Sequence, residues 1–167
     1  MSGLSIAEIV DKLEKARTKS ERLDILKAND CGALRGLLRM NFDASLKLAL
    51  PEGVPPFNKS TSPVGFGDTT LKASAKGWYV FTKELAPSLT QTKRESIFIS
   101  LLEKLDSKEA EILLNAKDRK LDLGLTKKLI DEVFPGLIRS ENTKHGGKKE
   151  SAKNTNTSTA KSDGEGV

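Results

Sequence analysis

Few side chains in this 167-residue chain are suited to catalysis. His145 is its single histidine and Cys31 its single cysteine. A Ser-His-Asp or Cys-His arrangement therefore has no base in the regular part of the sequence, and a zinc site cannot be completed. Glu109 and Glu111 are close in sequence, but two-residue spacing places them on different sides of a helix. We therefore expect no enzyme, no metal site and no cofactor.

The residues whose pattern could bind a ligand are basic and lie near predicted helix starts. Arg119 and Lys120 precede Gly124, which lets the chain turn close to a ligand, and Thr126 is an N-cap signal followed by Lys127 and Lys128. Free N–H groups at a helix start favour an anion, and two lysines there are unfavourable unless an anion is near. The predicted phosphate site is Arg119, Lys120, Gly124, Thr126, Lys127 and Lys128, with Lys93 and Arg94 as a second contact.

The same turn has a simpler interpretation. Gly124 is also typical of a helix C-cap and Thr126 of an N-cap, so the segment could be a solvated helix–turn–helix with no ligand. The formal charge of +5, from 28 basic and 23 acidic residues, is compatible with a nucleic-acid partner but does not decide between the two interpretations.

The segments that position these residues are predicted to be helices. Apolar residues at helical spacing follow a series of N-cap signals, and no alternating apolar–polar run of useful length predicts a strand. We expect a compact all-α domain of about seven or eight helices. The predicted starts are at Ser5, Thr18, Asn29 or Asp30, Asp43, Thr69 or Thr70, Thr92, Ser107 and Thr126.

Two of these elements carry specific expectations. The helix that starts at Asp43 should be short, since Pro51 would stop it. The helix that starts at Thr69 or Thr70 should run to Pro87 and supply Tyr79 and Leu85 to the core.

Residues 51–67 contain Pro and Gly at seven positions, so a regular element is not expected there. A loop of this length is usually functional or packed as an extended strap. We favour a strap, anchored on the helices by Val54, Phe57, Val64 and Phe66.

The chain divides near Arg139. Residues 1–138 are predicted to form the helical domain. Residues 139–167 are rich in Lys, Ser, Thr, Asn and Gly, cannot bury enough apolar surface to offset their ordering entropy, and are predicted to be disordered. The N-terminus lacks a signal-peptide pattern, and no apolar run approaches the ~20 residues that span a bilayer. We expect no membrane association.

Residues Glu111 to Ile138 resemble the end of the N-terminal DNA-binding domain of T-even-phage ATP-dependent DNA ligases. The shared pattern runs from Arg119 through Leu121-Asp122-Leu123-Gly124 to Thr126, and then over Val133 to Ile138 without a gap. The sequence Lys161-Ser162-Asp163-Gly164 matches the lysine motif of those ligases. It is interpreted as accidental, because no nucleotide pocket can be built from the three residues after it.

The chain as a whole also resembles uncharacterised proteins of T-even-like tailed phages, through Asn41-Phe42-Asp43, Leu50 to Gly53, and Lys93 to Glu95. The ligase resemblance implies an all-helical domain that grips duplex DNA through its backbone, here without the catalytic domains. The phage resemblance implies a location in the host cytoplasm, or in the virion.

Three hypotheses follow for function. The first is a non-catalytic, phage-encoded module that binds duplex DNA phosphates without sequence specificity. The second is a protein-interaction module that docks onto a phage replication or repair protein, for which the 51–67 loop could present Phe57 and Phe66. The third is a minor virion component. The sequence does not indicate an oligomeric state.

Overall fold

The computed structural model describes residues 3–139, which form seven α-helices and one 3-10 helix, with no strand among them. The elements are α1 (Ile6–Lys15), α2 (Lys19–Ala28), α3 (Gly32–Phe42), α4 (Leu71–Ser74), the 3-10 helix η1 (Ala75–Phe81), α5 (Gln91–Lys104), α6 (Ser107–Lys117) and α7 (Lys127–Val133). The all-α prediction is confirmed. Apart from Arg139, the predicted tail lies outside the described residues, as do His145 and Lys161.

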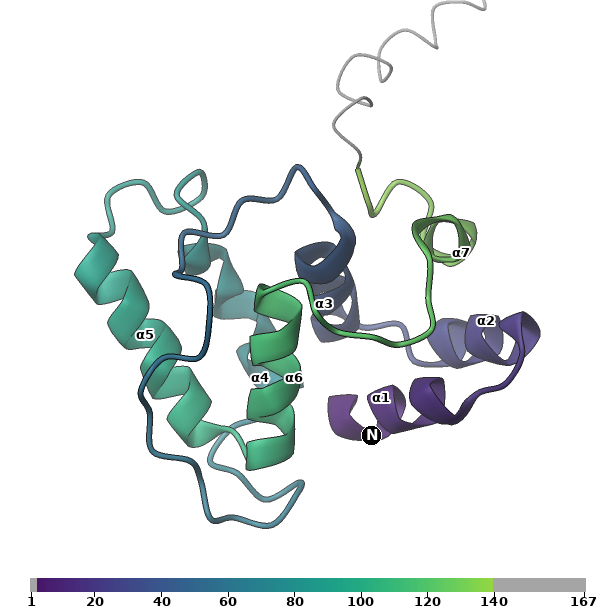
Figure 1. Ribbon diagram of the computed structural model, residues 1–167, viewed down its shortest axis with the longest axis horizontal. Helices are drawn as coiled ribbons and strands as arrows, with labels where there is room; N and C mark the ends of the chain where they lie inside the picture. The colour runs from purple at the N-terminus through teal and green to yellow at the C-terminus, as the bar shows by residue number, and fades with distance from the viewer. Residues whose placement is uncertain (1–2, 140–167) are drawn as a thin grey trace, which may run out of the picture.

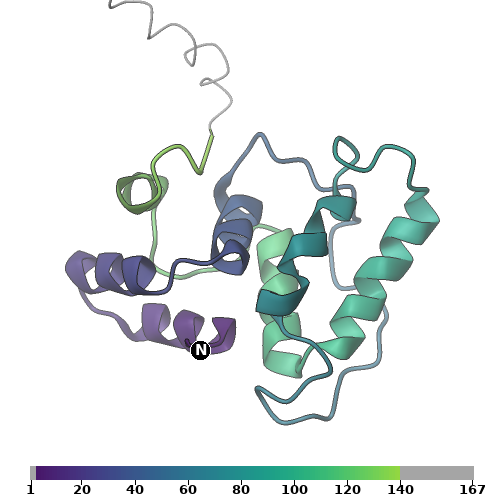
Figure 2. The same cartoon turned by 180° about the vertical axis from the view of Figure 1, so that it is seen from behind.

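Helix α3 lies at the centre of the molecule (Figures 1 and 2) and packs against α6, α4 and η1. Helix α1 packs on α2 and α6, and α2 also packs on α7. The apolar faces of these helices form one continuous core, in which Leu13, Leu38 and Leu113 are fully buried. Burying an amphipathic face in this way supplies most of the stability of helices this short.

The first two helices begin where the sequence predicts. Ser5 and Thr18 each accept a hydrogen bond from the backbone N–H three residues on, and Glu8 and Glu21 complete the two capping boxes. Because the Glu21 carboxylate accepts the backbone N–H groups of Arg17 and Thr18, its pKa is lowered.

Three other predicted starts are displaced by one or two residues. Helix α3 is preceded by Cys31, which makes no side-chain cap, and not by Asn29 or Asp30. Helix α5 begins after Thr90, whose side chain accepts the Lys93 N–H, so the predicted Thr92 cap is wrong. Helix α6 is capped by Asp106 and not by Ser107.

The predicted helix from Asp43 to Pro51 does not form. Asp43 follows the last residue of α3, and its Oδ1 accepts both the backbone N–H of Ser45 at 2.9 Å and the Ser45 hydroxyl at 2.6 Å. This Asx turn redirects the backbone at the position where a new helix would have to start. Leu48 instead forms an isolated antiparallel bridge with Thr82.

The predicted helix from Thr70 to Pro87 is also interrupted. It begins at Thr70 as expected, but tightens into η1 and ends at Phe81, and Tyr79 and Leu85 are exposed rather than in the core. The buried guanidinium of Arg94 lies at this interruption and donates hydrogen bonds to the carbonyls of Val80, Ala86 and Leu89. Of these, the Val80 carbonyl is one that a continuous helix would use, as acceptor for the N–H of Glu84.

The strap over residues 51–67 has no helix or strand, as predicted, but its anchors are mostly polar. Phe57 packs on the core, whereas Val54, Val64 and Phe66 are exposed. The anchoring groups are side chains of α5 and α6 and their caps. The N–H groups of Gly53, Asn58 and Gly65 donate to the carboxylates of Asp118, Glu103 and Asp106.

Candidate functional site

The segment that carries the predicted phosphate-binding residues begins where α6 ends. The N–H of Lys120 donates to the carbonyl of Asn115 at 2.7 Å, and the N–H of Arg119 donates to Ala116 at 3.1 Å. This pair of bonds is a Schellman motif, in which the residue after the C-cap adopts a left-handed conformation and is usually glycine. Here that residue is Arg119, with φ of 61°.

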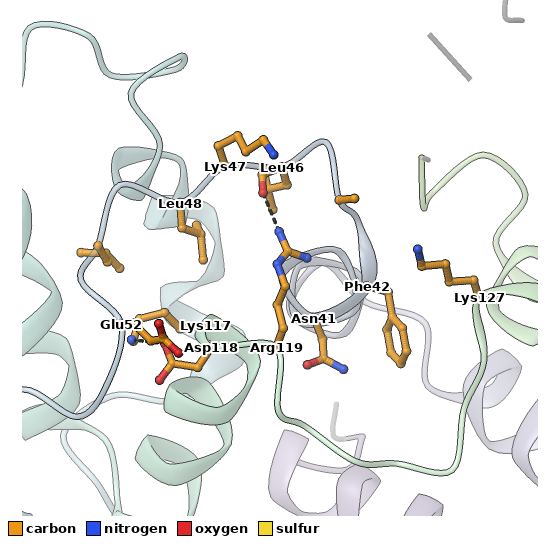
Figure 3. A pocket seen from close by; sticks show the side chains of 12 residues that line it. Asn41, Phe42, Leu46, Lys47, Leu48, Glu52, Lys117, Asp118, Arg119 and Lys127 are labelled. Carbon is orange, nitrogen blue, oxygen red and sulfur yellow. Dashed lines mark hydrogen bonds and ion pairs between the residues drawn. The ribbon is translucent and has the colours of Figure 1, made fainter. Parts of the chain in front are cut away.

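An arginine in this conformation is unusual, because the Cβ atom crowds the backbone when φ is positive. The Arg119 side chain is held by a hydrogen bond, which its Nη2 donates to the carbonyl of Leu46 at 2.7 Å. Arg119 is exposed, and Figure 3 shows its side chain rising between the 46–48 segment and the end of α3. One cation is thereby held at a fixed place on the surface.

Around Arg119 lies an open hollow of about 650 Å³ (Figure 3). One wall is the end of α3 with the segment that follows it, and the other is the end of α6 together with Lys127 of α7. Its cations are Lys47, Lys117, Arg119 and Lys127, and its anions are Glu52 and Asp118. The lining is completed by Asn41, Phe42, Ala44, Leu46, Leu48 and Leu50.

Lys117 and Asp118 do not contribute free charge to this hollow. Both side chains are at most 8% exposed, and they form an ion pair of 2.6 Å. The Lys117 ammonium also donates to the carbonyls of Pro51 and Gly53, at 2.8 and 3.0 Å. The two charges of this pair cancel, and the bonds from Lys117 to Pro51 and Gly53 hold the strap in place. The other charged residues of the lining are Lys47, Arg119, Lys127 and Glu52.

The two walls are joined by a buried side chain that sequence reasoning did not select. The amide of Asn41 donates to the carbonyl of Leu121 at 2.8 Å and accepts the N–H of the same residue at 3.0 Å. The side chain of Asn41 thus satisfies both backbone groups of Leu121, 80 residues away, as a neighbouring strand would do. The sequence signal that could have indicated this role is Asn-Phe-Asp at 41–43, which places two polar side chains at the end of an apolar helix.

Gly124 turns the chain as predicted, with φ of 71°, and the space beside it is taken by a side chain of α2. A Cβ at this position would lie 2.8 Å from Nε of Arg22, whose guanidinium packs against the glycine and donates to the carbonyl of Ala16 at 2.8 Å. The glycine therefore makes room for α2. The simpler interpretation of Gly124 as a helix C-cap is wrong, because α6 ends at Lys117 and Asp118 is its C-cap.

The next predicted signal is confirmed. Thr126 caps α7, and its hydroxyl accepts the N–H of Leu129 at 3.1 Å. Lys127 and Lys128 occupy the first turn and are exposed, and within residues 3–139 no carboxylate forms an ion pair with either one, or with Lys120. Lys127 faces the hollow (Figure 3).

Lys93 and Arg94, the predicted second phosphate contact, lie in different environments. Arg94 is 1% exposed, and its guanidinium donates to the carbonyls of three residues and to Oε1 of Gln91, so it is part of the core and is not placed to reach a phosphate. Lys93 is exposed on α5 and does not line the hollow. The structure thus brings Arg119 and Lys127 together, adds Lys47, and separates Lys93 and Arg94 from them.

Buried carboxylates elsewhere serve the fold. Burial raises the pKa of Glu109, and its Oε1 accepts the N–H of Leu71 at 2.8 Å. Within residues 3–139 no group of three or more His, Cys, Asp and Glu side chains is placed to hold a metal ion. No helix in this part of the chain has both the length and the apolar character to cross a membrane.

A protein-family model, described as "Family of unknown function (DUF6433)", matches residues 9–123, which are 115 of the 167 residues. No curated protein matches the chain. The matched range contains every residue that lines the hollow except Lys127.

Proposed function

Since the chain belongs to this family of unknown function, whose description names no activity, we propose from the geometry of the hollow that the protein is a non-catalytic module that binds duplex DNA. It contacts phosphates and does not read base sequence. On this proposal the protein is encoded by a phage and acts in the cytoplasm of the infected host, as the sequence resemblances imply.

The observation that carries the proposal is the placement of Arg119. Its positive φ is unfavourable for any residue with a Cβ, yet its side chain is at the surface, beside Lys47 and across an open hollow from Lys127. Strained backbone conformations cluster at binding sites, so an exposed arginine at positive φ beside other cations favours a ligand site here. Arginine also binds phosphate with two parallel hydrogen bonds, which fixes an orientation.

Duplex DNA fits the shape and charge of this region. The hollow is open to solvent, as suits a convex polyanion better than an enclosed small molecule. Lys120 and Lys128 are exposed in the same segment and can contact neighbouring phosphates. Phosphate contacts alone carry no sequence information, so binding is expected to be independent of sequence and to weaken as salt rises.

The test is a salt titration of binding to a fluorescein-labelled 20-base-pair duplex. The double variant R119A/K127A is compared with K27A/K83A, which removes the same charge from exposed lysines that do not line the hollow. If each lost contact is worth about 1 kcal/mol, R119A/K127A should bind roughly 30-fold more weakly at low salt. The slope of log K against log salt should fall by about 1.8.

Equal affinities for the two double variants would contradict the proposed site. A full-length protein that shows no salt-dependent binding to duplexes of unrelated sequence would contradict the function.

A second candidate function is docking onto another protein, for example a replication protein. It is favoured by Val64 and Phe66, which are 57% and 74% exposed at the tip of an otherwise well-anchored strap. Capture of a partner that survives nuclease treatment and is lost in the F66A variant would support this candidate. Loss of the partner on nuclease treatment would contradict it.

A further inference from the structure

A second groove lies between α5 and the segment that contains α4 and η1. Figure 2 shows this segment beside α5, and η1 packs against that helix. The groove encloses about 710 Å³ and does not share a lining residue with the hollow around Arg119. It is lined by Asp68, Thr69, Ser74, Gly77, Trp78, Phe81, Lys93, Ser96, Ile97, Ser100, Leu101 and Lys104.

The charged groups of this groove are the ammonium groups of Lys93 and Lys104 and the carboxylate of Asp68. Lys93 is in the first turn of α5 and Lys104 is the last residue of that helix. A rise of 1.5 Å per residue places them roughly 16 Å apart along the helix axis. The hydroxyls of Ser96 and Ser100 come from the same face of α5, between the two lysines, and both serines are exposed.

The floor of the groove is apolar. It is made by Trp78 and Phe81 of η1 together with Ile97 and Leu101 of α5. Trp78 is 7% exposed, and its indole N–H donates to the hydroxyl of Ser74 at 3.1 Å, so the ring is held in one orientation. An apolar floor with two lysines and one carboxylate, and so a net positive charge, suits a ligand with flat apolar groups and spaced negative charges.

A hydrogen-bonded turn precedes the backbone that contacts Lys104, and it carries Phe66, an exposed aromatic residue outside the lining of the groove. The N–H of Phe66 donates to the carbonyl of Pro63, and Gly65 has φ of 92°, which together describe a type II turn. The turn is fixed because the N–H of Gly65 donates to the buried carboxylate of Asp106 at 3.0 Å. The N–H of Thr69 donates to the carbonyl of Lys104, and Phe66, three residues before it, is 74% exposed.

We propose that this groove binds an unpaired strand of nucleic acid, with phosphates at Lys93 and Lys104 and one base stacked on Phe66. At a rise of about 3.4 Å per nucleotide, 16 Å spans roughly five nucleotides of a stacked strand. A basic groove with an aromatic stacking platform is the recurrent arrangement for single-stranded nucleic acid. The proposal rests on the function proposed above, since it extends the same partner class to a second, unpaired part of the DNA.

Because Trp78 is the single tryptophan of the chain and lines the groove, its fluorescence reports binding there. A labelled 12-nucleotide oligothymidylate is titrated against the full chain at low salt by anisotropy, and Trp78 fluorescence is recorded in parallel. K93A/K104A should bind about 30-fold more weakly than the charge-matched control K27A/K83A. F66A should lose roughly tenfold. D68N removes the acid that lines the groove and should bind more tightly.

Bound oligothymidylate should also quench or shift the Trp78 emission in the wild type, because the strand would lie over the edge of that ring. R119A/K127A should retain this signal. If K93A/K104A binds the oligonucleotide as well as the control does, or if Trp78 emission is unchanged at saturation, the groove assignment is overturned.

Two further outcomes separate this proposal from its alternatives. Duplex binding that depends on Arg119 and Lys127, together with oligothymidylate binding that ignores Lys93 and Lys104, refutes the groove and leaves the proposed function intact. Competition by a 12-residue polyglutamate as strong as that by oligothymidylate refutes base stacking and indicates an acidic peptide. Dependence on both Phe66 and the two groove lysines supports the proposal.

Discussion

Replacing Arg119 by glycine and by alanine separates the strain of the backbone from the use of the charge. Both variants lose the guanidinium and its hydrogen bond to the Leu46 carbonyl. Only glycine relieves the conformation at φ of 61°. The left-handed conformation destabilises the folded state by about 1–2 kcal/mol for a residue with a Cβ, and glycine avoids this cost. Glycine also gives the unfolded chain more conformational freedom, which offsets about 0.4–1 kcal/mol of the stability gained.

R119G should therefore be more stable than R119A by about 0.5–1 kcal/mol, or about 2–4 °C in Tm for a domain of this size. The lost hydrogen bond to an exposed carbonyl is worth about 1 kcal/mol. R119A is thus expected to be less stable than the wild type, and R119G close to it. Urea unfolding followed by Trp78 fluorescence measures all three proteins under one condition.

Duplex affinity gives the second measurement. Both variants should bind DNA with the same reduced affinity, since neither retains the cation. Equal stability of R119G and R119A would refute the argument that Arg119 is strained. Recovery of DNA binding in R119G would refute the argument that its guanidinium contacts phosphate.

Three further predictions concern buried polar groups. N41A should lower the free energy of unfolding by about 2–4 kcal/mol in urea, because the N–H and C=O of Leu121 lose their partner, whereas N58A should have little effect. R94K should lower it by about 3 kcal/mol, because lysine cannot serve three carbonyls in a fixed plane, while DNA affinity of the folded fraction should be unchanged. Burial raises the pKa of Glu109, so the folded state holds that proton above pH 4.5 while the unfolded state releases it. Stability of the wild type should then fall relative to E109Q as pH rises from 4.5 through the folded-state pKa, in urea titrations at pH 4 and pH 7. A parallel pH dependence of the two proteins would contradict this assignment.

The comparison with E109Q is needed because other carboxylates act in the opposite direction. The hydrogen bond from Arg35 lowers the pKa of Asp30. Burial alone would raise the pKa of Asp43, but hydrogen bonds from Ser45 and the charge of Arg39 lower it overall. Stability that these groups contribute is lost as pH falls through their folded-state pKa values. Both effects are common to the wild type and E109Q and cancel in the difference.

The sequence alone determined the helical class and most of the helices, because the signals involved are local. A capping box such as Ser5 with Glu8, or the apolar spacing of Ile6, Ile9, Val10 and Leu13, acts within one or two turns of the same helix. Thr126 was identified as a cap for the same reason, and the segment from Arg119 to Lys128 was identified as basic and turned. Local chemistry was sufficient for each of these inferences.

Only the tertiary structure decided which of these cations share a surface. Arg94 and Lys93 are neighbours in sequence, yet Arg94 is buried with its guanidinium bound to the carbonyls of Val80, Ala86 and Leu89, whereas Lys93 is exposed. Asn41 and Lys47 join the site because Leu121 and Arg119 fold back onto the end of α3 from 70 or more residues away. A buried donor must find an acceptor wherever the chain brings one, and a single sequence does not record which distant carbonyl that will be.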